Sequence, residues 1–227
     1  MTNFTTWRSL VDGQDLFAIP DSGDLHAHYD FSEYSGTGGF NDLSGNGHDL
    51  VNGSITGVGE SINGVQAGEF DGTDDSVRTD SFTDIGTHTA FAVVRPDGPE
   101  GNNNLLSVQQ SDHTVVEWQE FDDRGWSMAT DGEFNFSDNT TTETAILTSV
   151  NNADTNVLRL NGAEILAYSA SAGVADVIGI GSREPFDATN YFEGAVGEVP
   201  VYPSEKSTSK IEEIESYLAD KWGVSLS

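Results

Sequence analysis

Residues 191–227 read YFEGAVGEVPVYPSEKSTSKIEEIESYLADKWGVSLS, and they predict one core strand followed by one helix. In the first part of this segment, apolar side chains alternate with glutamates and small residues, which is the period of a β-strand. Gly194 and Gly197 lie inside the alternation and indicate a strand that bends or that another backbone approaches closely. The apolar members of the strand are Phe192, Val196, Val199 and Val201.

The helix is expected to begin shortly after Pro203, which ends the strand. Ser204 or Ser207 can cap it, because a serine hydroxyl accepts a hydrogen bond from a free backbone N–H. Gly223 marks its end. The apolar residues at helical spacing are Ile211, Ile214, Tyr217, Leu218 and Trp222, and the residues expected on the solvated face are Lys206, Lys210 and Glu212–Glu215.

Two segments further upstream point to the same fold as this ending. They are DLHAHYDFSEYSGTGGFNDLSGNGHDL at Asp24–Leu50 and AGEFDGTDDSVRT at Ala67–Thr79. With the glycine-bent strand and the Y-L-x-x-K-W-G ending, they resemble, in order, the motifs of concanavalin A-like lectin/glucanase domains, and most closely the laminin G-like jelly roll. The resemblance runs from Asp24 to the C-terminus. It implies an all-β fold, an antiparallel two-sheet jelly-roll sandwich with one C-terminal α-helix, in which the concave sheet carries ligand.

The rest of the chain has the pattern of such a sandwich, with many short strands separated by turn residues. Thr89–Arg95 is apolar enough to be a central strand. Val65–Phe70 and Asp75–Thr79 are expected to pair as a hairpin around an Asp-Gly turn. Asn161–Gly162 is a strong tight-turn signal.

Residues 1–23 lie outside the resemblance and are predicted to be an N-terminal arm, with the jelly-roll domain occupying residues 24–227. The arm has several large apolar residues, so it is expected to pack either on its own sandwich or on a neighbouring subunit of a homo-oligomer. It also resembles the short leader segments that precede jelly rolls in structural proteins of haloarchaeal viruses and proviruses.

Composition predicts a halophilic protein. The chain has 38 acidic and 9 basic residues and a net charge of -29, and the carboxylates are spread along its length. Such a surface stays hydrated in molar salt, where the repulsion between its charges is screened. We expect no nucleic-acid partner, because no basic patch is present. The absence of cysteine excludes disulfides and thiolate zinc sites.

No apolar run of about 18 residues occurs, so membrane insertion is not expected. The N-terminal residues also lack the basic leader and apolar stretch of a signal peptide. Jelly rolls of this kind are usually extracellular. A virion protein assembled in the host cytoplasm reconciles these observations, and an extracellular or cell-surface location is the alternative.

Catalysis is not expected. In the glucanase branch of the resembled family, carboxylates two residues apart on one strand point into the same cleft. Glu120 and Asp122 are the one candidate pair, and the third carboxylate of the motif is missing. His26 and His28 share one strand face, but a metal site there lacks a placed third ligand. We therefore predict a protein that is not an enzyme.

Calcium is the one cofactor for which the sequence contains possible ligands. The resembled family often carries calcium near its loops, and hard oxygen ligands suit this ion. Asp42 and Asn46 of the D-x-S-G-N-G loop supply such oxygens, as do their neighbours Asn41 and Asp49, and Glu198 of the last strand can lie nearby. In the alternative interpretation, Asp42 and Asn46 only cap turns of their own backbone.

A sugar-binding surface needs exposed aromatic rings beside planar polar groups. Trp118 and Trp126, with Asp122 and Arg124 between them, form the candidate cluster. In the alternative interpretation, Trp118 points inward and belongs to the core.

Together these observations predict a non-enzymatic structural or adhesion protein of a haloarchaeal virus particle. It would be a capsid decoration, a turret, or a tail or fibre component. Its partners would be itself, other virion proteins and glycans of the host envelope glycoprotein. The first alternative is a carbohydrate-binding, lectin-like module of a halophilic archaeon. A glycoside hydrolase ranks behind both, because the carboxylate motif is incomplete.

Overall fold

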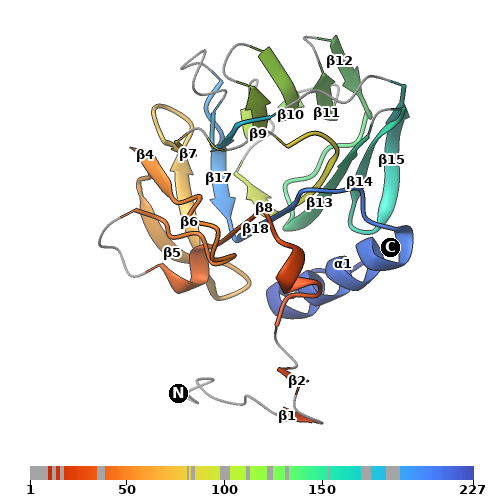
Figure 1. Ribbon diagram of the computed structural model, residues 1–227. Coiled ribbons are helices and arrows are strands. Elements are labelled where there is room, and N and C mark those ends of the chain that lie inside the picture. The colour runs from red at the N-terminus through yellow and green to blue at the C-terminus, as the bar shows by residue number, and fades with distance from the viewer. Residues whose placement is uncertain are drawn as a thin grey trace.

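The computed structural model describes residues 10–11, 14–15, 18–34, 39–80, 82, 85–97, 103–110, 113–121, 125–130, 133–152, 154–169, 175–182 and 190–227. Most of these residues form two antiparallel sheets packed face to face, with one α-helix at the C-terminal end (Figure 1). The predicted jelly-roll sandwich is therefore confirmed. None of the described helices is long and apolar enough to cross a membrane.

The first sheet has seven strands. In spatial order they are β12 (Glu133–Phe136), β11 (Gly125–Thr130), β10 (His113–Phe121), β9 (Asn103–Gln110), β16 (Val177–Ile180), β7 (Ser76–Thr79) and β4 (Leu50–Ser54).

The second sheet has nine strands. Seven of them run in the order β15 (Ala163–Tyr168), β14 (Asn156–Leu160), β13 (Ala145–Asn151), β8 (His88–Pro96), β17 (Glu193–Val196), β6 (Val65–Asp71) and β5 (Gly57–Ile62). The other two are β18 (Glu198–Tyr202), which pairs with β8, and β3 (Ala27–Asp30), which pairs with β18. The predicted central strand corresponds to β8, which is buried along nearly its whole length.

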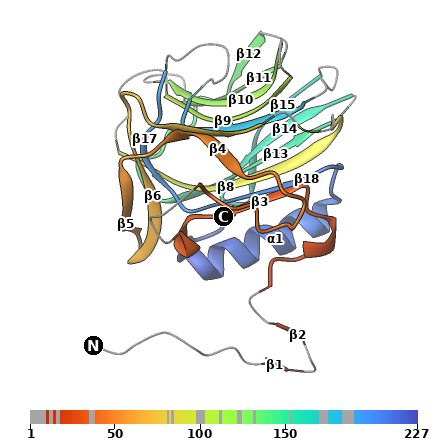
Figure 2. The same ribbon diagram turned by 60° about the vertical axis from the view of Figure 1, so that its left-hand side comes forward.

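Two hydrophobic clusters hold the sandwich together. The larger cluster lies between the sheets and includes Tyr29, Phe31, Leu106 and Val199. The smaller cluster lies between the outer face of the nine-stranded sheet and helix α1 (Thr208–Trp222), which runs along that face (Figure 2). The members that α1 contributes are Ile211, Ile214, Leu218, Ala219 and Trp222, so the apolar face predicted from helical spacing is the buried one.

The final strand and helix follow the sequence prediction with one difference. Gly197 interrupts the strand and divides it into β17 and β18. Its N–H donates to Val93 O, and a Cβ there would lie 2.8 Å from the Trp222 ring, so a larger residue forces the ring or the strand to shift. The helix ends at Gly223 in the left-handed conformation, as predicted. Ser207 occupies the N-cap position, but its side chain makes no capping hydrogen bond.

The hairpin predicted around Asp71–Asp74 is wrong. β6 belongs to the nine-stranded sheet and β7 to the seven-stranded sheet, so this turn carries the chain from one sheet to the other. The Asp75 carboxylate stabilises this connection between the sheets, because it accepts hydrogen bonds from the N–H groups of Thr56 and Asp71. The tight turn at Asn161–Gly162 between β14 and β15 is confirmed, and both residues have positive φ.

The expected solvated face around α1 is wrong at two positions. Lys206 is 8% exposed, and its ammonium group pairs with Asp24. Glu215 is 1% exposed and forms two hydrogen bonds with Arg159, at 2.9 and 3.0 Å. Both residues look like surface charges in the sequence, and their partners lie far away along the chain.

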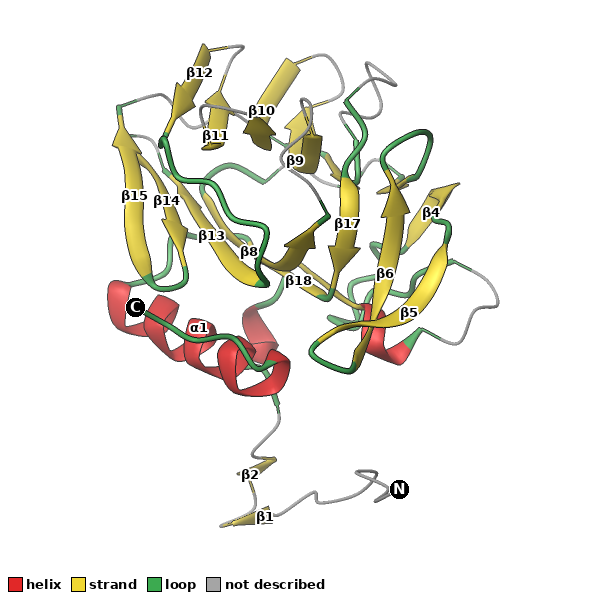
Figure 3. Ribbon diagram, turned by 180° about the vertical axis from the view of Figure 1, so that it is seen from behind, coloured by secondary structure: helices red, strands yellow, loops and turns green. Residues whose placement is uncertain are grey.

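The residues just before the predicted domain boundary already belong to the sandwich. Ile19 is buried in the cluster beneath α1, and Tyr202 donates its hydroxyl to Pro20 O. The boundary predicted after Gly23 falls within the short 3-10 helix η1 (Ser22–Asp24). Further towards the N-terminus, β1 (Leu10–Val11) and β2 (Gln14–Asp15) pair with each other and lie apart from the two sheets (Figure 3).

Candidate functional site

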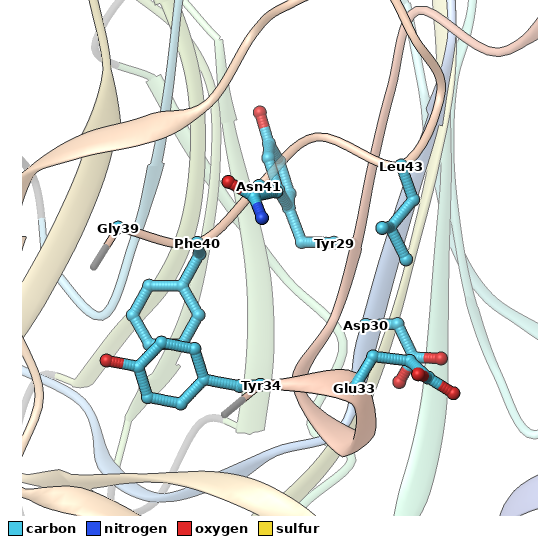
Figure 4. A pocket seen from close by; sticks show the side chains of 8 residues that line it. All are labelled: Tyr29, Asp30, Glu33, Tyr34, Gly39, Phe40, Asn41 and Leu43. Carbon is cyan, nitrogen blue, oxygen red and sulfur yellow. The ribbon is translucent and has the colours of Figure 1, made fainter. Parts of the chain in front are cut away.

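A pocket opens beside β3, the first strand of the sandwich (Figure 4). It lies between the short 3-10 helix η2 (Phe31–Glu33) and the loop that begins at Gly39. Its free space, the open mouth included, is about 430 Å³. The residues that line it are Tyr29, Asp30, Glu33, Tyr34, Gly39, Phe40, Asn41 and Leu43.

Stacked aromatic rings form one wall of this pocket. The ring of Tyr34 stacks on that of Phe40, with 4.1 Å between centroids and 28° between planes. Phe40 is buried and packs in turn on Phe31 of the main core. Tyr34 is half-buried, so its ring is held by the core and still reaches the pocket.

Polar groups line the rest of the pocket, and only some of them already bond to other protein groups. The Asp30 carboxylate accepts hydrogen bonds from Ser32 and forms an ion pair with Lys221 at 2.5 Å. Glu33 and Asn41 are exposed, and their side chains make no hydrogen bond within the described part of the chain. Figure 4 places the carboxylates of Asp30 and Glu33 together on one side of the pocket.

A buried ionic network anchors the strand that carries this pocket. Glu198 of β18 is fully buried, and its carboxylate accepts hydrogen bonds from Trp222 Nε1 at 2.8 Å and Lys221 Nζ at 2.7 Å. His28 Nε2 lies 2.7 Å from the other carboxylate oxygen. Because Lys221 also holds Asp30, the network connects β3, β18 and α1.

Opposing effects set the pKa values in this network. Burial raises the pKa of Glu198, but the hydrogen bond from His28 and the charge of Lys221 outweigh it and lower the pKa to about 2. Burial lowers the pKa of Lys221, but the charges of Glu198 and Asp30 outweigh it and raise the pKa above its ordinary value. Both groups are therefore charged at neutral pH.

The D-x-S-G-N-G loop is organised by Asp42. Its carboxylate accepts hydrogen bonds from the N–H groups of His28, Ser44 and His48, at 2.9, 2.9 and 3.0 Å, and from the Ser44 hydroxyl at 2.7 Å. Burial raises the pKa of Asp42, and these hydrogen bonds outweigh it and lower the pKa. Asn46 donates through Nδ2 to the carbonyls of Leu25 and His26.

These contacts bear on the predicted calcium ligands. Asp42 organises the turn of its own loop, as in the alternative interpretation, whereas Asn46 connects the loop to the backbone of Leu25 and His26. The described hydrogen-bond partners of Glu198 are His28, Tyr217, Lys221 and Trp222, and none of these four residues belongs to that loop. Calcium binding stays a prediction.

Sequence reasoning missed another acidic group as a possible cation site. Carboxylate oxygens of Asp71, Asp74 and Asp75 lie within 4.8 Å of one another at the turn between β6 and β7. The signal lies in the FDGTDD stretch at Phe70–Asp75, whose aspartates and glycine predict a turn. Two of these carboxylates are already used, since Asp71 accepts from Thr73 N and Asp75 from Thr56 N.

The predicted sugar-binding cluster is only partly described. Trp126 is fully buried in the core between the sheets, so the expectation that its ring is exposed is wrong. The alternative interpretation of Trp118, an inward-pointing core residue, thus applies to Trp126. Trp118 lies in β10 opposite Leu106 and Met128, and its side chain is outside the described part. Asp122 and Arg124 lie outside the described residues altogether.

The two histidines that the sequence places on one strand face make different contacts. His28 contacts Glu198, whereas His26 stacks on His48 with 4.4 Å between ring centroids. Burial lowers the pKa of His26 to about 4. The side chain of Glu120 and the whole of Asp122 lie outside the described part.

No protein-family model and no curated protein matches this chain. Similarity appears at the level of structure. Domain 4 of AbnA, an extracellular GH43 arabinanase from Geobacillus stearothermophilus solved with arabinotriose, matches with a TM-score of 0.62 and 15% identity. The match covers 85% of this chain and 98% of that domain.

Two larger proteins contain a similar fold. Trypanosoma rangeli sialidase, solved with sialic acid, matches with a TM-score of 0.64 and 12% identity over 90% of this chain and 34% of the sialidase. The binding domain of botulinum neurotoxin serotype D matches with a TM-score of 0.59 and 10% identity over 86% of this chain and 51% of that domain. This chain thus spans about a third and about half of these two structures. At such identities the matches establish the class of fold, a jelly-roll β-sandwich.

Proposed function

We propose that this chain is a non-enzymatic adhesion or architectural protein of a haloarchaeal virus particle, and that it binds glycans of the host envelope. It would serve as a capsid decoration, a turret, or a tail or fibre component. The observation that carries the glycan-binding part is the match to AbnA domain 4. Nearly all of that domain is covered, and it was solved with an oligosaccharide. The viral part rests on composition and on the resemblance of the N-terminal arm.

The charge distribution supports a protein that works in high salt. The net charge is -29 over 227 residues. Most of the described basic side chains are already paired with carboxylates: Arg95 with Asp97, Arg159 with Glu215, Lys206 with Asp24, Lys210 with Asp21, and Lys221 with Asp30 and Glu198. The surface potential is therefore strongly negative at low salt, and molar salt reduces the Debye length to about 3 Å.

The test is co-sedimentation in molar salt. Purified protein is mixed with intact haloarchaeal cells and, separately, with their isolated envelope glycoprotein, with and without a chelator. Saturable binding that deglycosylation of the envelope protein removes is the expected result. Absence of binding to cells and to glycoprotein contradicts glycan recognition and leaves an architectural role, which sedimentation velocity tests as a defined homo-oligomer.

The chelator separates the remaining possibilities. Binding that a chelator abolishes and calcium restores supports the predicted cofactor. A monomer with calcium-dependent glycan binding, and no association with purified virions, favours the lectin-like module of a halophilic archaeon. Hydrolysis of a glycan that Glu120→Gln abolishes contradicts the non-enzymatic proposal.

A further inference from the structure

We propose that the pocket lined by Tyr34, Phe40, Glu33 and Asn41 is the glycan-binding site, and that it takes a single neutral sugar unit. This inference rests on the proposed glycan-binding function. It moves the site from the predicted middle strands, where Trp126 is buried, to the edge of the sandwich beside β3.

The aromatic wall supplies a surface on which a sugar can stack. The C–H faces of a sugar ring are apolar and pack well on an aromatic ring. Tyr34 lines the pocket, and it is held in place by the stacked ring of Phe40 and by its backbone carbonyl, which accepts a hydrogen bond from Gln66. A platform fixed before the ligand arrives loses little conformational entropy on binding.

The unused polar groups supply hydrogen bonds. The Glu33 carboxylate is an acceptor that makes strong, charge-assisted hydrogen bonds to hydroxyl groups. The Asn41 amide offers both a donor and an acceptor. Both side chains are exposed at the pocket, and within the described part of the chain neither is engaged by the protein. Sugar hydroxyls, which donate and accept, match this pair.

Size and charge define the class of ligand. The pocket is shallow and open, and its free space of about 430 Å³ includes the solvent at its mouth, so a ligand no larger than a single sugar unit suits it. In molar salt the field of distant charges is screened within about 3 Å, so only groups that touch the ligand discriminate by charge. Asp30 is compensated by Lys221, whereas Glu33 is not, and Glu33 therefore disfavours an anionic sugar.

The experiment is ligand-observed NMR titration of the whole chain in molar KCl. The probes are the methyl glycosides of glucose, galactose, mannose and arabinose, with glucuronic acid as the anionic comparison. The wild type is expected to bind at least one neutral probe and to bind glucuronic acid more weakly. Tyr34→Ala is expected to weaken binding about tenfold or more, which corresponds to the loss of one stacking contact. Tyr34→Phe keeps the ring and is expected to bind nearly as the wild type does.

Two further variants test the polar groups. Glu33→Gln is expected to weaken binding of the neutral probe and to reduce the discrimination against glucuronic acid. Glu212→Gln removes an exposed carboxylate on α1, away from the pocket, and is the matched control that leaves binding unchanged. Thermal unfolding confirms that each variant is folded.

The outcomes separate this inference from the function on which it rests. If the wild type binds envelope glycoprotein but Tyr34→Ala and Glu33→Gln bind as well as it does, glycan binding stands and the pocket assignment is overturned. If the wild type binds none of the neutral probes, the pocket does not take a single neutral sugar unit. If it also fails to bind cells and glycoprotein, the proposed function itself fails.

Discussion

Replacing Lys221 by methionine tests how the buried ionic network holds the two ends of the sandwich together. Methionine keeps an unbranched apolar side chain and removes the charge. The two carboxylates that Lys221 contacts, those of Asp30 and Glu198, are 6% and 0% exposed, so their charges lose their cationic partner without gaining water. We expect Lys221→Met to lower the free energy of unfolding at pH 7.

The magnitude follows from the pKa of Glu198. Lowering that pKa from 4.5 to about 2 corresponds to about 3 kcal/mol, at 1.36 kcal/mol per pH unit. Removing one partner of a buried pair typically costs about 3–5 kcal/mol. Here the hydrogen bonds from His28 and Trp222 remain, and the Lys221 side chain is 23% exposed, so we expect the lower value of about 2–3 kcal/mol. At about 2–4 °C per kcal/mol, the melting temperature falls by about 4–12 °C.

The pH dependence identifies the cause of this loss. Glu198 has a lowered pKa in the folded state, so its contribution is present above about pH 4.5 and disappears as the pH falls towards 2. The difference between wild type and Lys221→Met is therefore largest at neutral pH and shrinks in acid. Thermal unfolding in molar salt from pH 7 to pH 2 measures it, and the pair is buried enough to resist screening.

The double variant Lys221→Met with Glu198→Gln is the control, because it removes the uncompensated charge and keeps an acceptor for Trp222. It is expected to be more stable than Lys221→Met alone. A difference between wild type and Lys221→Met that stays constant from pH 7 to pH 2, or a double variant that is less stable still, would show that packing and not charge accounts for the loss.

Three other substitutions probe separate features of the sandwich. Gly197→Ala places a methyl group 2.8 Å from the Trp222 ring and is expected to lower the free energy of unfolding by about 1–3 kcal/mol, with altered tryptophan fluorescence. A variant as stable as the wild type would mean that the Trp222 ring or the strand shifts at no cost. Glu215→Gln weakens the buried ion pair with Arg159 and is expected to lower the free energy of unfolding by about 1–3 kcal/mol. A double-mutant cycle with Arg159→Met measures the interaction energy of the two side chains, and a value of zero contradicts a stabilising ion pair. Burial lowers the pKa of His88 to about 4, so the free energy of unfolding of the wild type decreases as the pH falls from 6.5 to 4. His88→Gln is expected to make the free energy of unfolding depend less on pH in this range, and an unchanged dependence assigns the effect to other groups.

Local signals in the sequence predicted several of the strands, the helix and a turn, and the resemblance to concanavalin A-like domains implied how they assemble. Alternation identified β8 and the final strand, helical spacing identified α1, and Gly223 and Asn161–Gly162 marked the end of the helix and a tight turn. Each of these features depends on residues that are close together along the chain.

Features that depend on distant partners were not predictable in the same way. Lys206 and Glu215 are buried because Asp24 and Arg159, 182 and 56 residues away, compensate their charges. The turn at Asp71–Asp74 resembles a hairpin turn locally, and only the position of β7 in the other sheet shows that it is a crossing.

The pocket was missed for a related reason. Its aromatic, acidic and amide residues lie within a short stretch from Asp30 to Leu43, where the sequence predicts the end of a strand and a loop with possible calcium ligands but no aromatic pocket. Whether Tyr34 stacks on Phe40 depends on how the loop closes, which composition does not determine. The combination of a tyrosine, a glutamate and an asparagine around a glycine-rich turn was the available signal.

The pairing of β3 with β18 has a consequence for how the molecule folds. β18 is the only strand that pairs with β3 among the described elements, and the two are separated by nearly the whole domain. Contacts so distant in sequence carry a large loop-closure entropy and slow folding. During synthesis, β3 therefore has none of its described strand partners until β18 has left the ribosome. We expect closure of the sandwich to be a late step, and chains truncated before β18 to expose the core that β3 helps to cover.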